Sequence, residues 1–191
     1  MNRENEKKLD ELLGGNRRFC EGNLIHPHGS AARRGEVADG QHPAAVLLTC
    51  SDSRVPPEIL FDRGLGDLFV VRTAGNVVDD SVLGSIEYAV VHLGVRLIVV
   101  LGHTNCGAVG AALAKAEAKG HLNFVTMALH AAVDEVRHIE GDIYDLASRR
   151  NVELTVAALK SSEPILAPLN SELEIVGCYY DLDSGRIQVV C

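Results

Sequence analysis

The hydrophobic positions of this chain form short continuous runs separated by longer segments of helical periodicity. Three apolar runs rich in β-branched residues predict buried strands of a parallel sheet: residues 44–49, 67–71 and 96–101. Residues 81–93 lie between the last two runs and have helical spacing, with Ser81 as the expected N-cap and Gly94 as the end. This alternation predicts right-handed crossovers and an α/β fold with a mostly parallel central sheet flanked by helices.

The segments at the two ends extend this picture. Residues 4–20 have the pattern of an amphipathic N-terminal helix, and a stretch rich in glycine, histidine and proline follows at 22–35. A short helix that starts with proline is expected near Pro56. Three further helical stretches are expected at residues 106–119, 122–139 and 143–160. Residues 173–190 predict a hairpin that adds an edge to the sheet. Without a repeat or a linker, a single domain over residues 1–191 is expected.

Composition narrows the possible functions. The chain has 191 residues, 47% of them hydrophobic, and a net charge of −8, which argues against nucleic-acid binding. No apolar run approaches the ~20 residues that span a bilayer, so no membrane segment is expected. The first residues lack the apolar stretch of a signal peptide, and a cytoplasmic protein is therefore expected.

The five cysteines indicate metal binding or free thiols rather than a disulfide framework, because their number is odd. Cys20, on the amphipathic helix, and Cys178, in an apolar strand, are expected to be small core residues. Cys50 and Cys106 differ from these because polar residues surround them. They are the candidates for chemistry.

Two short motifs carry that chemistry, and each directly follows a predicted strand. The first is Cys50-Ser-Asp52-Ser-Arg54, and the second is His103-Thr-Asn-Cys106. Open α/β sheets bind ligands just outside the carboxyl ends of their strands, so these side chains should converge. Two thiols, an imidazole and a carboxylate form a zinc ligand set, although these ligands can also bind cobalt or iron.

The paired motifs resemble the signature of the β-class carbonic anhydrases. Other stretches resemble that family in the same order: residues 12–19, 41–43, 67–76 and 85–90. The resemblance runs from about residue 9 to the end and is strongest between residues 41 and 110. It implies a zinc enzyme that reversibly hydrates carbon dioxide to bicarbonate and a proton.

The resemblance also implies one zinc ion per subunit, held by Cys50, Asp52, His103 and Cys106. In a closed state Asp52 would occupy the fourth zinc position. In an open state Asp52 would pair with Arg54 and water would take its place. Zinc lowers the pKa of that water to about 7, and the resulting hydroxide would attack carbon dioxide.

The substrate pocket is likewise assigned by resemblance. Gln41 would hydrogen-bond a substrate oxygen, Phe69 and Tyr88 would wall the pocket, and Ala74 stands where many members carry valine. The backbone amide of Gly107 is a further candidate donor. In the family this pocket lies at a subunit interface, which implies a homodimer or a higher homo-oligomer. The N-terminal helix and arm, residues 1–40, are expected to pack against the partner subunit.

One departure concerns regulation. Some bacterial members bind regulatory bicarbonate with a tryptophan at the position of Leu47, and this chain has no tryptophan. Arg72 matches another residue of that pocket but cannot rebuild it alone, so this regulation is not expected.

Two other functions fit the same residues. A hydrolase of carbonyl sulfide or carbon disulfide would use a nearly identical site with a different pocket. A non-catalytic structural zinc module is also possible, with Asp52 permanently bound to the metal. The Asp52–Arg54 pair argues against the module, because a structural site needs no competitor for its fourth ligand.

Overall fold

The computed structural model describes residues 2–114 and 119–191 and contains a five-stranded sheet in the order β2-β1-β3-β4-β5. The strands are β1 (Ala45–Cys50), β2 (Leu68–Thr73), β3 (Leu97–His103), β4 (Glu174–Tyr180) and β5 (Ile187–Val189). The first four strands in this order pair in parallel, and β5 pairs antiparallel with β4 at the edge. The expected α/β fold, with its mostly parallel sheet and C-terminal hairpin, is confirmed.

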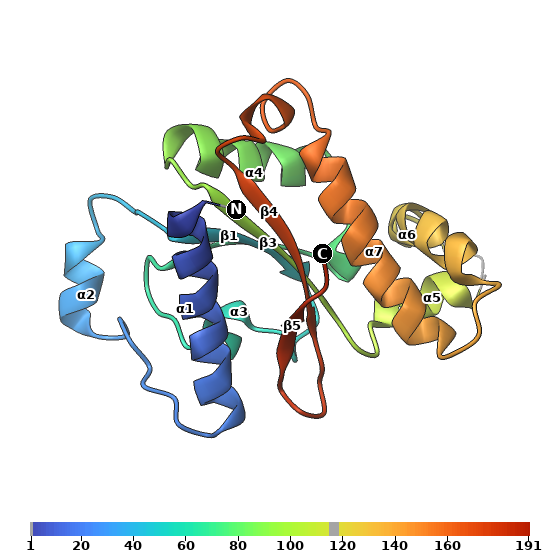
Figure 1. Ribbon diagram of the computed structural model, residues 1–191, viewed down its shortest axis with the longest axis horizontal. Coiled ribbons are helices and arrows are strands. Elements are labelled where there is room, and N and C mark those ends of the chain that lie inside the picture. Colours follow the sequence, from blue (N-terminus) through green and yellow to red (C-terminus); the bar gives the residue numbers. More distant parts are fainter. Residues whose placement is uncertain (1, 115–118) are drawn as a thin grey trace.

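Helices cover both faces of this sheet. The α-helices are α1 (Arg3–Cys20), α2 (Ala31–Glu36), α3 (Pro57–Leu60), α4 (Asp80–His92), α5 (Gly107–Leu113), α6 (Leu122–Val136) and α7 (Ile143–Lys160). Two short 3-10 helices are η1 (Ala74–Asn76) and η2 (Ala167–Leu169). Figure 1 shows α1 and α7 on opposite sides of the strands. The molecule is therefore layered as helix, sheet and helix.

The alternation of side chains along β1 divides the core into two halves. Val46 and Leu48 pack with α4 and α7 on one face, whereas Ala45 and Leu47 pack with α1 and α3 on the other. All six residues of β1 are buried. A strand buried on both faces reads as a continuous apolar run, which explains why this strand was visible in the sequence.

Four local features differ from the sequence prediction. The N-cap of α4 is Asp79, whose carboxylate accepts a hydrogen bond from the amide of Val82, and Ser81 lies inside the helix. Helix α5 ends at Leu113 instead of continuing to residue 119, and residues 115–118 of that prediction lie outside the described residues. Cys20 is exposed, because it lies at the end of α1, while Cys178 is buried as expected. Helix α2 was not predicted, and it begins inside the stretch at 22–35 that is rich in glycine, histidine and proline.

Helix α1 is fixed to its own sheet. Leu9 and Leu12 are buried against the core on this face. Buried Asn16 donates to the carbonyls of Leu60 and Gly185 and accepts a bond from the amide of Ile187. These bonds join the helix to two distant segments of the same chain. Contact of residues 1–40 with a partner subunit stays a prediction.

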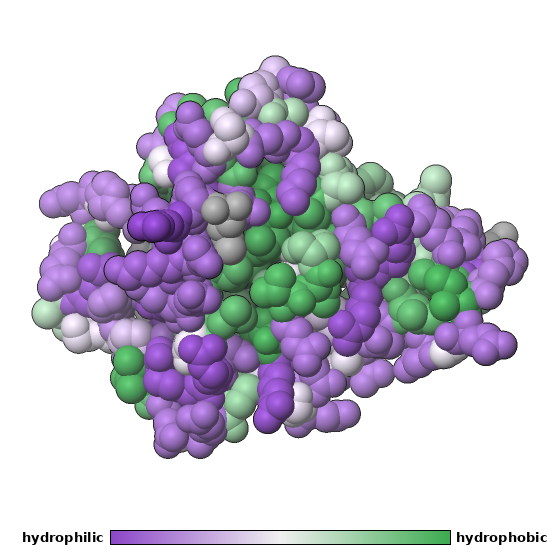
Figure 2. All heavy atoms as spheres, viewed as in Figure 1, coloured by the Kyte–Doolittle hydropathy of each residue, from purple (hydrophilic) through white to green (hydrophobic). Residues whose placement is uncertain are grey.

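The carboxyl ends of β1 and β3 lie at one edge of the sheet, next to a third apolar cluster. This cluster combines Cys50 and Cys106 with apolar residues of α5, α6 and the first half of α7. The outer surface in Figure 2 is mostly hydrophilic, with hydrophobic side chains in the middle of the view, over β4 and β5. Within the described residues, no helix is long and apolar enough to cross a bilayer.

Candidate metal centre

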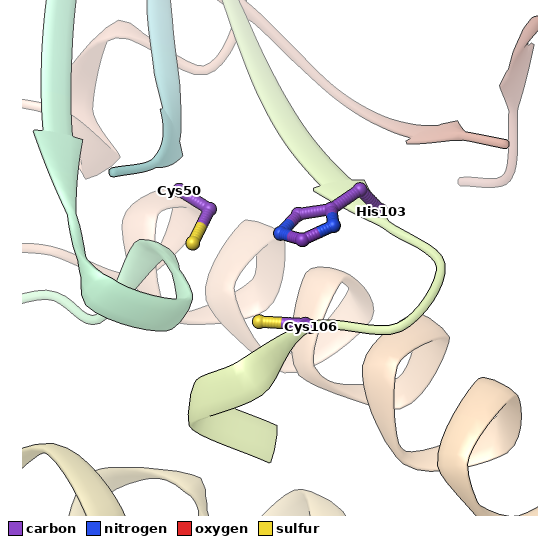
Figure 3. A group of neighbouring side chains, drawn as sticks. All are labelled: Cys50, His103 and Cys106. Atoms are coloured by element: carbon purple, nitrogen blue, oxygen red, sulfur yellow. The ribbon is translucent and has the colours of Figure 1, made fainter. Parts of the chain in front are cut away.

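Three side chains meet at the carboxyl edge of the sheet. Cys50 ends β1, His103 ends β3, and Cys106 directly precedes α5. Their ligand atoms all lie within 4.8 Å of one another, and all three residues are buried. Figure 3 shows both sulfur atoms and the imidazole ring turned toward a common centre. Two sulfurs and one nitrogen at this spacing suit a tetrahedral zinc ion with one position left open.

The tautomer of His103 supports this interpretation. Its Nδ1 atom lies 2.8 Å from the carbonyl oxygen of Thr104, and a carbonyl can only accept a hydrogen bond. The Nδ1 atom therefore carries a proton, and Nε2 is the ring atom that is left to bind a metal. Nε2 is buried and has no hydrogen-bond partner among the described residues. A buried acceptor without a partner is costly, and a metal ion would satisfy it.

The two thiols also fit a cation. A hydrogen bond from Cys106 lowers the pKa of Cys50, whereas the pKa of Cys106 is raised by the same contact and by burial. The pair thus keeps one proton between them, because two adjacent buried thiolates repel each other. A divalent cation would replace that proton and stabilise both thiolates.

Backbone groups of η1 support the Cys50 sulfur. The amide of Gly75 donates to the sulfur at 3.2 Å, and Asn151 holds the Gly75 carbonyl with a bond of 3.0 Å. Gly75 has a φ of +66°, and a Cβ there would lie 3.0 Å from the side chain of Ala108. Glycine is therefore needed both for the left-handed conformation and for the close approach.

The carboxylate of Asp52 is engaged by Arg54. The Nε and Nη2 atoms of Arg54 donate to the two carboxylate oxygens at 2.9 and 2.7 Å, and the backbone amide of Arg54 adds a bond of 2.9 Å. Arg54 also donates to the carbonyl of Asn105, in the second motif. Hydrogen bonding by Arg54 lowers the pKa of Asp52 to about 2, so the carboxylate is charged at neutral pH.

Arg72 organises the first motif in a way that the sequence did not reveal. Its guanidinium donates to the carbonyls of Cys50 and Asp52, at 3.1 and 2.7 Å. It therefore fixes the turn that carries one thiol and the carboxylate. Arginine beside a motif has many possible partners, and two backbone carbonyls leave no signal in the sequence.

Thr104 and Tyr144 support the second motif. The Thr104 hydroxyl accepts a hydrogen bond from the amide of Leu182 at 2.9 Å, and the backbone amide of Thr104 donates to the carbonyl of Tyr180. The Tyr144 hydroxyl donates to the carbonyl of Cys106 at 2.7 Å. The hairpin and α7 thus hold the loop between His103 and Cys106. Tyr144 could not be found from the sequence, because it lies 38 positions after Cys106 in the chain.

The expected substrate residues fall into two groups. Ala74 and Gly107 adjoin the ligands, since Ala74 follows the residue paired with Cys50 and Gly107 follows Cys106. Phe69 instead pairs with Val46, four positions before Cys50, which is roughly 13 Å along the strand. Within one chain, Phe69 is therefore far from the thiols.

Tyr88 and Gln41 belong with Phe69. The ring of Tyr88, on α4, lies 6.3 Å from that of Phe69 and is 48% exposed. Gln41 is exposed and precedes the amino end of β1, the end opposite Cys50. One chain does not bring these three residues to the metal centre.

Comparison with known proteins gives a consistent result. The model of the carbonic anhydrase family matches residues 45–187. Carbonic anhydrase 2 of Mycobacterium tuberculosis is 47% identical over 181 residues, covering 92% of this chain and 87% of that protein. The carbonic anhydrase of Mycolicibacterium smegmatis is 44% identical over 184 residues, covering 93% and 89%.

Solved structures agree with the sequence comparison. The Coccomyxa β-carbonic anhydrase in complex with acetazolamide has a TM-score of 0.78 and 29% identity, covering 95% of this chain and 86% of that one. A tetrameric β-carbonic anhydrase of Sordaria macrospora has a TM-score of 0.76 and 28% identity, covering 96% and 97%. The chain belongs to the carbonic anhydrase family and, within it, to the β class.

Proposed function

We propose that this protein catalyses the zinc-dependent, reversible hydration of carbon dioxide to bicarbonate and a proton. The observation that carries the proposal is the buried group of Cys50, His103 and Cys106, in which Nε2 of His103 faces two thiols and has no hydrogen-bond partner in the part of the chain that the structure describes. Bound zinc would supply a coordinated water with a pKa of about 7, and so a nucleophile near neutral pH. Family membership supports the reaction, and the donor set supports the metal.

The role proposed for Asp52 and Arg54 is control of the fourth metal position. Arg54 binds both oxygens of the carboxylate, which keeps Asp52 from serving as a ligand. The charged carboxylate then remains available to accept a hydrogen bond from the nucleophile and to orient it. If Arg54 releases Asp52, the carboxylate is close enough in sequence to Cys50 to occupy the open position instead.

Gln41, Phe69 and Tyr88 are proposed to complete the substrate pocket of a second subunit. They lie at the opposite end of the sheet from their own metal centre, and the exposed side chains of Gln41 and Tyr88 are available to a partner. A homodimer or a larger homo-oligomer would place them beside the partner's Ala74 and Gly107. A cytoplasmic location also stays a prediction.

The first test is stopped-flow hydration of carbon dioxide on protein of known zinc content, across a range of pH. We expect rapid turnover in the wild type and simultaneous loss of zinc and activity in Cys106→Ser. Full activity without zinc would contradict the mechanism. A zinc-loaded protein that is inactive toward carbon dioxide but hydrolyses carbonyl sulfide would favour the hydrolase, and inactivity toward both gases would favour a structural module.

A further inference from the structure

A second site lies away from the metal centre, in a cavity of about 990 Å³ between α1, the β4–β5 hairpin and α7. We propose that this cavity binds a small organic anion that carries carboxylate or phosphate groups. Three arginines in its lining would bind the anion: Arg17, Arg149 and Arg186. The site contains none of the metal ligands or substrate residues, so it does not rest on the proposed reaction, although α1, which lines one side of it, is also expected to contact a partner subunit.

Two of the three arginines have no acidic partner. Neither Arg17 nor Arg186 forms an ion pair with any residue that the structure describes. Arg149 is bound by Asp145 at 2.7 Å, and its guanidinium lies 4.0 Å from the ring centre of Tyr179. Guanidinium groups suit carboxylate and phosphate oxygens because they can bind two oxygens at once.

The backbone holds Arg17 and Arg186 near each other. Asn16, the residue before Arg17, donates to the carbonyl of Gly185 at 2.9 Å and accepts from the amide of Ile187 at 2.8 Å. Gly185 and Ile187 are the two neighbours of Arg186. The segments carrying these arginines are therefore clamped together before any ligand arrives, which reduces the entropy cost of binding. Figure 1 shows α1 beside the hairpin.

The charges around the cavity are balanced in number, so anion binding depends on which charged groups are already engaged. Glu21 and Asp181 are the acidic residues of the lining, and Asp145 pairs with Arg149 beside it, so three arginines meet three carboxylates. Asp181 is already engaged, because one of its oxygens accepts bonds from the amide and hydroxyl of Ser184. The whole chain has a net charge of −8. Long-range repulsion from the rest of the protein would oppose anion binding, so specific contacts must supply the affinity.

The volume of the cavity indicates the size of the ligand that it can hold. Small-molecule pockets commonly enclose about 300–1000 Å³, and this cavity lies at the upper end of that range. It accommodates a molecule with several carbon atoms rather than a single small ion. Gln188 in the lining adds a side-chain amide that can bind a further oxygen.

The proposal is tested by isothermal titration calorimetry on the zinc-loaded full chain. The probes are sodium succinate and glycerol 3-phosphate, each at constant ionic strength. We expect saturable binding of at least one probe, and the tighter one identifies the carboxylate or the phosphate as the preferred group. The double variant Arg17→Gln/Arg186→Gln should weaken that binding by about tenfold or more, since two charged hydrogen-bond donors are lost.

Arg34→Gln is the matched control, because Arg34 is an exposed arginine on α2, away from the cavity. It should bind the probe like the wild type. Absence of saturable binding to the wild type would overturn the proposal. An equal weakening in the control and the double variant would also overturn it, because only the overall charge would then matter.

Discussion

Arg54 binds both carboxylate oxygens of Asp52, through its Nε and Nη2 atoms at 2.9 and 2.7 Å. The side chain of Asp52 is 17% exposed, so this pair lies between the buried ligands and the surface. The same guanidinium donates to the Asn105 carbonyl, between His103 and Cys106. One arginine therefore contacts both motifs, and its position links the carboxylate to the loop that carries two metal ligands.

Replacing Arg54 with alanine should reduce hydration activity while leaving zinc bound. The thiols and the imidazole are unchanged, but Asp52 loses its partner and becomes free to occupy the fourth metal position. We expect kcat/KM to fall by about 10- to 100-fold, on the scale of hydrogen bonds to charged groups. Stopped-flow assays combined with zinc analysis would measure both quantities.

Arg34→Ala is the control for this change, since it removes an exposed arginine elsewhere. Arg54→Lys is also informative, because lysine keeps the charge but not the two-oxygen geometry. Wild-type turnover in Arg54→Ala would show that Arg54 does not control Asp52.

Thr104→Val should weaken zinc binding through His103. The valine keeps the shape of the side chain but removes the oxygen that accepts from the Leu182 amide. The Thr104 carbonyl, which orients the imidazole, then loses part of its support. Loss of a direct hydrogen-bond partner of a metal ligand commonly costs about 10- to 100-fold in metal affinity. Because this hydroxyl acts one step further out, we expect a loss of about tenfold or less, which a chelator competition assay would measure.

Thr104→Ser should restore most of the affinity, because serine supplies the same oxygen. If Thr104→Val binds zinc as tightly as the wild type, the hydroxyl has no positioning role. Equal loss in both variants would indicate a packing effect of the methyl group instead.

Asp62 should stabilise the fold in a pH-dependent way. Its buried carboxylate accepts bonds from Arg18 and from the amides of Ile25 and His26. Burial raises the pKa of this carboxyl, but these hydrogen bonds outweigh it, and the pKa is lowered overall. Because the folded state binds the proton less tightly than the unfolded state, the stabilisation is complete above the unfolded pKa of about 3.9.

Asp62→Asn should therefore be less stable at pH 7, by about 1–3 kcal/mol in urea unfolding. The difference from the wild type should shrink as the pH falls below 4 and the wild-type carboxyl becomes protonated. A difference that stays constant from pH 7 to pH 3 would show that the charge of Asp62 is not its source.

The sequence predicted the parts of the structure that depend on local pattern. The strands β1 and β3 are buried on both faces and appear as apolar runs, and both ligand motifs follow directly from them. The prediction of Ser81 as the N-cap of α4 was wrong, because Asp79 and Ser81 are both good capping residues and only backbone geometry selects Asp79. Arg72 and Tyr144 act on backbone carbonyls of distant residues, which no local pattern encodes.

The same limit applies to the substrate residues, whose distance from the thiols depends on strand register. Phe69 is separated from Cys50 because it pairs with Val46, and resemblance alone did not show on which side of an interface it acts. If Gln41, Phe69 and Tyr88 serve a partner's metal centre, each complete site draws residues from two chains. Mixing two inactive variants can test this directly.

Gln41→Ala should lose activity but keep zinc, whereas Cys106→Ser should lose both. Co-refolded mixtures of the two would contain heterodimers. In these, the Gln41→Ala chain supplies intact ligands, and the Cys106→Ser chain supplies an intact Gln41 to the same site. An equal mixture would place about half of all chains in heterodimers, each with one complete site of two. We therefore expect about one quarter of wild-type activity to return, as expected for random pairing of two subunits. If Gln41 instead serves its own chain, every site in the mixture remains defective and no activity returns.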